Sequence, residues 1–146
     1  MIDAVQIDPI LFVRWKEQCD AQDVPLIKRS VESASREIGA DRLVYISLIP
    51  IGVPPPDART RAALRDGTVH ARERCASVHI VIEGAGLRRA LIRSISAGLL
   101  LATRASFLIH ADVRSALEAA AQTVAMDIDE ILGHVKEQGW SSSALA

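Results

Sequence analysis

Two polar residues, Glu83 and His110, have the types and positions that acid–base chemistry would need. Each ends a short apolar run typical of a buried strand, and a carboxylate beside an imidazole can act as a general base. Ligands of open α/β sheets bind beyond the carboxyl ends of the strands, so the pair would meet there if the two strands are neighbours. No serine or cysteine nucleophile is placed with them. An enzyme built on Glu83 and His110 is therefore an alternative to the main interpretation.

A glycine turn follows Glu83 at the start of an expected helix, with Gly84 and Gly86 as its glycines. The backbone N–H groups of such a turn can bind an anion at the helix N-terminus. The turn lacks the third glycine of a dinucleotide fingerprint and the lysine of a P-loop. We interpret it as a tight turn and keep a weak anion or ligand site at Glu83, Gly84, Gly86 and His110 as an alternative.

The other histidines and the cysteines show no spacing typical of a metal site or a redox motif. These residues are His70, His79, His134, Cys19 and Cys75. His79 lies inside an expected strand and is interpreted as a core residue. No metal and no cofactor is predicted, and two lone thiols are typical of a reducing compartment.

Composition indicates one globular domain. Of the 146 residues, 49% are hydrophobic and 24% are charged, which favours a folded core over disorder. We expect a single domain over residues 1–140 and a disordered tail over residues 141–146. The N-terminus carries acidic residues where a signal peptide has a basic region, and the apolar run near residues 95–101 is too short to span a bilayer. A cytoplasmic protein without membrane insertion is expected.

Charge is distributed unevenly, although the net charge is only −1. Residues 57–104 carry nine basic side chains, all arginine, and four acidic ones, whereas both flanking regions are acidic. This pattern indicates either solvated helix faces or an arginine-lined surface for an acidic partner. Aromatic residues make up 3% of the chain, so no stacking platform for nucleic acid is expected.

The apolar periodicity predicts strands that alternate with helices. Strands are expected at residues 5–7, 10–16, 42–49, 78–82 and 105–110, and helices at residues 23–38, 57–75, 87–103, 112–122 and 127–138. Asp23, Asp57 and Asp112 are the expected N-caps of three helices. The helix at 57–75 has few apolar residues and Gly67 in its middle, so it is expected to meet the sheet through one narrow stripe. Together these elements predict an α/β fold with a mixed, mostly parallel sheet of four to five strands and helices packed on it.

The helix expected at residues 87–103 is apolar over more than one stripe. A surface helix needs only one such stripe, so the excess is either covered by another element or exposed for association. Ile92, Leu99 and Leu100 make the second stripe. We expect these three residues to form an oligomer surface, which would make the protein a homodimer.

Four local stretches, together with the element order, resemble a known family. They are a first strand that ends in Trp15-Lys16, the strand LVYISLIP, a loop of Pro54, Pro55 and Pro56 before an arginine-rich helix, and HIVIEGAGLRRALIRS before an apolar helix. Over residues 2–122 the chain resembles the SpoIIAA-like and STAS domains, the anti-sigma-factor-antagonist fold of bacteria. The stretches are most similar to those of small SpoIIAA-like bacterial proteins.

The resemblance implies a docking site for a protein partner at the start of the helix after the proline loop. The family's phosphorylatable serine, in an Asp-Ser-Ser/Thr-Gly turn, is absent here, and Thr60 is the nearest hydroxyl. The candidate partner-binding residues are Pro54, Pro55, Pro56, Asp57, Thr60, Arg61 and Arg65.

The main functional prediction is a non-catalytic regulatory module for protein–protein interaction in the bacterial cytoplasm. Some STAS-like folds resemble the lipid-binding SEC14 architecture, which implies the alternative of a small-molecule or lipid carrier with an internal pocket. A retained ligand would support the carrier, and a solid core would exclude it.

Overall fold

The computed structural model describes residues 1–54, 56–84, 86 and 108–140 of the chain. In chain order its elements are β1 (Ile2–Ile7), β2 (Ile10–Trp15), α1 (Asp23–Ile38), β3 (Val44–Ile49), α2 (Ala58–Arg74), β4 (Ser77–Ile82), β5 (Leu108–His110), α4 (Val113–Ala120) and α5 (Ile128–Glu137). None of the helices in these ranges is long and apolar enough to cross a membrane. The expected helix at 87–103, its oligomer surface of Ile92, Leu99 and Leu100, and the tail at 141–146 lie outside the described residues.

The five strands form one mixed sheet in the order β1-β2-β3-β4-β5. β1 and β2 are an antiparallel hairpin, and the other three neighbouring pairs are parallel. This confirms the mixed, mostly parallel α/β sheet expected from the sequence. Each parallel connection moves one strand along in the same direction, so right-handed crossovers place α1 and α2 on the same face.

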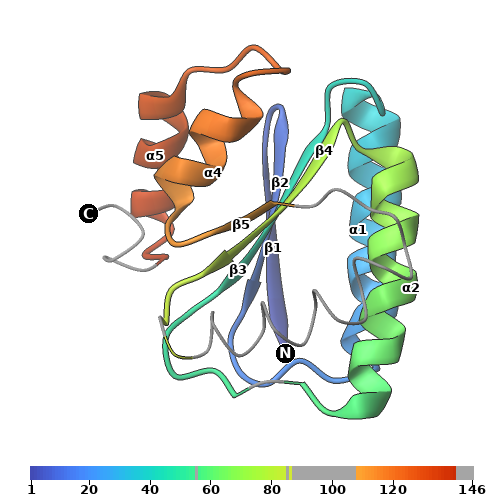
Figure 1. Ribbon diagram of the computed structural model, residues 1–146. Coiled ribbons are helices and arrows are strands. Elements are labelled where there is room, and N and C mark those ends of the chain that lie inside the picture. The colour runs from blue at the N-terminus through green and yellow to red at the C-terminus, as the bar shows by residue number, and fades with distance from the viewer. Residues whose placement is uncertain (55, 85, 87–107, 141–146) are drawn as a thin grey trace.

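The sheet lies between two helical layers, with α1 and α2 on one face and α4 and α5 on the other (Figure 1). Burial on both sides explains why all six residues of β3 are buried, because a doubly covered strand has no polar face. β1 lies at the edge of the sheet, and its residues are half-buried or exposed. The sequence pattern of each strand therefore follows its place in the sheet.

Alternate residues along the strands fill two separate hydrophobic cores. The core under α1 and α2 includes the strand residues Leu11, Val13, Trp15, Tyr45, Ile49, Val78 and Ile82. The core under α4 and α5 includes Ile10, Phe12, Val44, Ile46, Leu48 and Val81. The period of two along each strand decides which helical layer a side chain meets.

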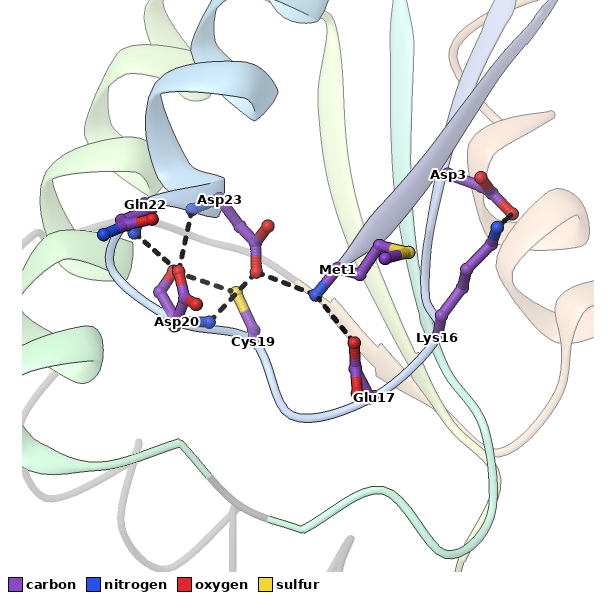
Figure 2. A network of polar contacts seen from close by, with 8 residues as sticks. All are labelled: Met1, Asp3, Lys16, Glu17, Cys19, Asp20, Gln22 and Asp23. Atoms are coloured by element: carbon purple, nitrogen blue, oxygen red, sulfur yellow. Dashed lines mark hydrogen bonds and ion pairs between the residues drawn. The ribbon is translucent and has the colours of Figure 1, made fainter.

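A network of polar contacts holds the start of α1 beside the first strand (Figure 2). The carboxylate of Asp23 accepts hydrogen bonds from the Met1 ammonium group at 3.1 Å and from the Asp20 N–H at 3.0 Å. Asp20 Oδ1 accepts from the N–H groups of Gln22 and Asp23 at 2.7 and 3.2 Å. The expectation that Asp23 is the N-cap is wrong. Asp23 is the first helical residue, and its carboxylate binds Met1 and Asp20 instead of the first helical turn.

The other described helices begin at aspartate caps. Asp57, Asp112 and Asp127 precede α2, α4 and α5, and each carboxylate accepts from the N–H three residues later, at 2.8, 2.7 and 3.1 Å. These contacts confirm the caps expected at Asp57 and Asp112. The bond from the Thr60 N–H lowers the pKa of the Asp57 carboxyl below its usual value, because a hydrogen-bonded carboxylate is stabilised in its charged form.

The C-terminal helix α5 packs on the sheet of its own chain. Its residues Ile131, Leu132 and Val135 are buried in the core under α4 and α5. Trp140 follows the helix and is also buried there, with its ring edge to face against Phe12 at a centroid distance of 6.1 Å. The end of the described chain is therefore part of a core.

Candidate functional site

A cavity of about 140 Å³ lies between the sheet and the layer formed by α1 and α2. Trp15, Ile49 and Ile82, the last residues of β2, β3 and β4, are among the residues that line it from the sheet. Val24 and Ile27 line it from the first turns of α1. The position agrees with the general rule that open α/β sheets bind ligands at the carboxyl ends of their parallel strands.

Small side chains on α2 account for the space. The buried residues of this helix are Thr60, Gly67 and Ala71, and none of them is large enough to fill the volume above the strands. Gly67 also allows the two helices to approach closely, because a Cβ there would lie 3.2 Å from Cγ1 of Val24. The helices α1 and α2 therefore pack closely against each other, whereas a space remains between α2 and the strands.

Three polar side chains, those of Trp15, Tyr45 and Ser47, belong to the buried wall of the cavity. Trp15 is 5% exposed, and its indole Nε1 is buried with no hydrogen-bond partner among the residues that the structure describes. Burial raises the pKa of the Tyr45 hydroxyl above its usual value, and a hydrogen bond with Ser47 acts in the opposite direction. All three groups are therefore neutral near pH 7, and no described residue in the interior of the cavity carries a charge.

Two arginines of α2 lie where the cavity reaches the surface. Arg61 and Arg65 line the cavity and are exposed to solvent. Arg61 Nη1 donates a hydrogen bond to the carbonyl oxygen of Pro56 at 3.1 Å, which holds the guanidinium group beside the loop. Within the described part of the chain, no ion pair engages either arginine. The cavity combines an apolar interior with a positively charged mouth.

Three of the candidate partner-binding residues line the cavity, and the other described ones lie beside them in the chain. Pro54, Asp57, Arg61 and Arg65 are exposed, Pro56 and Thr60 are buried, and Pro55 lies outside the described residues. Thr60 is only 2% exposed, so its hydroxyl is not presented at the surface. Pro56, Arg61 and Arg65 also line the cavity. The segment that the sequence indicates for docking and the mouth of the cavity are therefore the same place in the fold.

The residues of the expected weak ligand site lie at the ends of β4 and β5. Glu83 directly follows β4, Gly84 is half-buried, and Gly86 is exposed. His110 is the last residue of β5, and its Nε2 lies 3.0 Å from Nδ1 of His79. The hydrogen-bond partner of the His110 ring is thus a second histidine, which the sequence did not indicate.

Ser77, His79 and His110 form a hydrogen-bonded row across β4 and β5. Ser77 Oγ lies 2.9 Å from His79 Nε2. The centroids of the two imidazole rings are 5.2 Å apart. Burial lowers the pKa of His79 to about 4, with a further contribution from His110. Burial also lowers the pKa of His110, while the charge of Asp112 opposes this change. Both rings are neutral near pH 7, so one nitrogen of the pair donates and the other accepts.

The histidine row and the cysteines lie outside the lining of the cavity. No group of three or more His, Cys, Asp or Glu side chains in the described ranges could hold a metal ion. Burial raises the pKa of both Cys19 and Cys75 to about 12. The two thiols therefore stay protonated near neutral pH and are poor nucleophiles.

No protein-family model matches this sequence, and no curated protein matches it either. The resemblance to STAS domains accordingly stays a prediction from local sequence and element order.

Sequence reasoning missed the cavity residues Trp15, Tyr45 and Ser47. A signal was present, because the helix after the proline loop has few large apolar residues to cover the strands beneath it. The contact between His79 and His110 has no comparable signal. It depends on the register of β4 against β5, which are separated by 25 residues in the chain.

Proposed function

We propose that the protein is a non-catalytic binding module that holds a small, mainly apolar molecule in the cavity under α2. The cavity itself is the observation that carries the proposal. Protein interiors are packed as densely as organic crystals and contain few voids larger than a water molecule. A cavity of about 140 Å³ at the carboxyl ends of three parallel strands is therefore best explained as a binding site.

The indole of Trp15 supports the same proposal. Buried Trp N–H groups usually find a hydrogen-bond acceptor, and leaving one unsatisfied costs about 1–3 kcal/mol. Within the described residues Trp15 Nε1 has no such acceptor, although the residue lines the cavity. An unsatisfied buried donor is rare in a purely structural core, so its place in the cavity lining is typical of a functional site.

The volume limits the size of the occupant. An engineered apolar cavity of about 150 Å³ in another protein stays dry and binds benzene. The cavity described here is nearly as large, so it suits a single ring or a short branched chain. A full-length lipid would need more space than this conformation offers.

Toluene tests the proposal directly. We expect saturable binding with one site per chain, and a thermal midpoint raised by about 5 °C at ten times the dissociation constant. The indole N–H resonance of Trp15 should shift in the same titration. Because the chain has two tryptophans, the replacement Trp140→Phe leaves Trp15 as the only one and assigns the signal.

Two replacements on α2 provide the control. Ala71 lines the cavity and is buried, so Ala71→Leu should fill the space and weaken toluene binding at least about tenfold. Ala63 is half-buried on the same helix and does not line the cavity, so Ala63→Leu should leave binding unchanged. Absence of saturable binding to the original protein, or equal effects of the two replacements, would contradict the proposal.

A second candidate function is docking of an acidic protein partner on the surface around Pro54 and the start of α2. The exposure of Arg59, Arg61 and Arg65 on adjacent turns of this helix favours it, because arginine is well suited to bind carboxylates. Partner binding and ligand binding would then meet at one mouth.

An acidic peptide, decaglutamate, tests this second candidate. The double replacement of Arg61 and Arg65 by Glu should weaken peptide binding about tenfold or more while leaving the thermal midpoint nearly unchanged, because both side chains are exposed. The matched control replaces Arg114 and Lys136 by Glu in the opposite helical layer, with the same change in net charge. Equal weakening by both pairs would show an effect of net charge only and would remove the docking surface.

A further inference from the structure

We infer that the ligand of the cavity is a small carboxylic acid, with its apolar body in the cavity and its carboxylate at the mouth between Arg61 and Arg65. This inference rests on the proposed binding function and adds the chemical class of the ligand. Three observations carry it: the neutral interior, the two available guanidinium groups, and the occupied N-terminus of α2.

The neutral interior decides where each part of the ligand lies. Among the described residues that line the cavity, only Arg61 and Arg65 are charged, and both are exposed. A charge moved into the apolar interior without a partner would lose its hydration at a cost of several kcal/mol. The apolar part of a charged ligand must therefore lie inside, and its charged group must remain at the mouth.

The two guanidinium groups give that charged group its sign. Arg61 uses one of its five N–H donors on the Pro56 carbonyl, and Arg65 makes no ion pair or hydrogen bond within the described part of the chain. α2 as a whole carries five arginines against one aspartate and one glutamate. The mouth therefore attracts an anion, and a planar carboxylate matches the donor fork of an arginine.

The start of α2 favours a carboxylate over a phosphate. Phosphate sites commonly use the free N–H groups at a helix N-terminus. In α2 the Asp57 carboxylate already accepts from the Thr60 N–H at 2.8 Å and places a negative charge there. This negative charge makes the arginine side chains the favoured partners of an anion at the mouth, and a singly charged head group meets less repulsion from Asp57 than a doubly charged one.

A pair of matched probes tests the inference: 3-phenylpropionate and 3-phenylpropan-1-ol have the same apolar body and differ in charge. At pH 7 we expect the acid to bind about tenfold more tightly than the alcohol, because hydrogen bonds to a charged group are the stronger ones. Arg65→Gln should remove most of this preference and leave the affinity for the alcohol unchanged. Arg59→Gln is the matched control, because Arg59 is exposed on the same helix and does not line the cavity.

The outcomes distinguish failure of the binding function from failure of the carboxylic acid as its ligand. Binding of neither probe, together with no binding of toluene, would refute the binding function itself. Equal affinity for the acid and the alcohol, or equal effects of Arg65→Gln and Arg59→Gln, would refute the carboxylic acid and leave the apolar site standing. Tighter binding of 2-phenylethyl phosphate than of 3-phenylpropionate would overturn the choice of head group.

Discussion

Acidification from pH 7 to pH 4 is expected to lower the free energy of unfolding by about 2 kcal/mol through His79 alone. His79 is 1% exposed, and burial lowers its pKa from 6.5 to about 4. In the unfolded chain the same imidazole takes up a proton near pH 6.5, so the unfolded state binds more protons throughout this window. The contribution of His79 to the free energy of unfolding is therefore present above pH 6.5 and is lost as the pH falls toward 4.

The size of this effect follows from the pKa difference. The full difference corresponds to about 3 kcal/mol, and we reduce it because His110, the hydrogen-bond partner of His79, is only half-buried and admits solvent to the pair. When both rings are protonated, each of the two facing nitrogens carries a hydrogen, and the bond between the rings is lost. The charge of Asp112 raises the pKa of His110 and so opposes the effect of burial on that ring.

Urea unfolding at pH 7 and at pH 4 measures the prediction. His79→Gln keeps a donor and an acceptor but cannot titrate, so it should lose about 2 kcal/mol less than the original protein over this range. His134 is exposed on α5, and His134→Gln should retain the full loss. If His79→Gln and the original protein lose the same free energy, His79 is not held neutral by the fold.

Replacement of Trp140 by Ala is expected to destabilise the protein by about 3 kcal/mol. Trp140 is 5% exposed, and its ring meets Phe12 at an interplanar angle of 87°. Phe12 lies on β2 and is fully buried, so removal of the indole leaves a cavity in the core under α4 and α5. The edge-to-face contact itself contributes about 1 kcal/mol beyond the buried area.

A double-mutant cycle isolates that contact. Phe12→Leu, Trp140→Ala and the combined variant should give a coupling energy of about 1 kcal/mol in urea unfolding followed by circular dichroism. Ile51 is 75% exposed, and Ile51→Ala should change stability by no more than about 0.5 kcal/mol. A loss below about 1 kcal/mol for Trp140→Ala would mean that the residues after α5 do not belong to the core.

The strands could be predicted from the sequence because a buried strand appears as a short run of consecutive, mostly apolar residues. The prediction at 42–49 contains β3 (Val44–Ile49), and the prediction at 78–82 differs from β4 (Ser77–Ile82) by one residue. Both strands are covered on two sides, so nearly every residue had to be apolar. The cap at Asp57 could also be predicted, since a cap acts on a backbone group only three residues away.

The features that could not be predicted depend on contacts between distant residues. Asp23 has the residue type of a cap, but its carboxylate binds Met1, 22 residues earlier in the chain. The cavity depends on how far α2 stands from the strands, which Gly67 and Ala71 set together with the packing of α1. The functional site is therefore a property of the spacing between layers, and local sequence patterns do not record that distance.

The order of the strands in the sheet has a consequence for how the protein is made. Each described strand after β1 pairs with the strand that precedes it in the chain, so no strand has to insert between two that are already joined. The β1–β2 hairpin spans residues 2–15, and each later strand adds to an open edge as it leaves the ribosome. Such short-range pairing keeps contact order low for a parallel sheet and favours rapid, vectorial folding from the N-terminus.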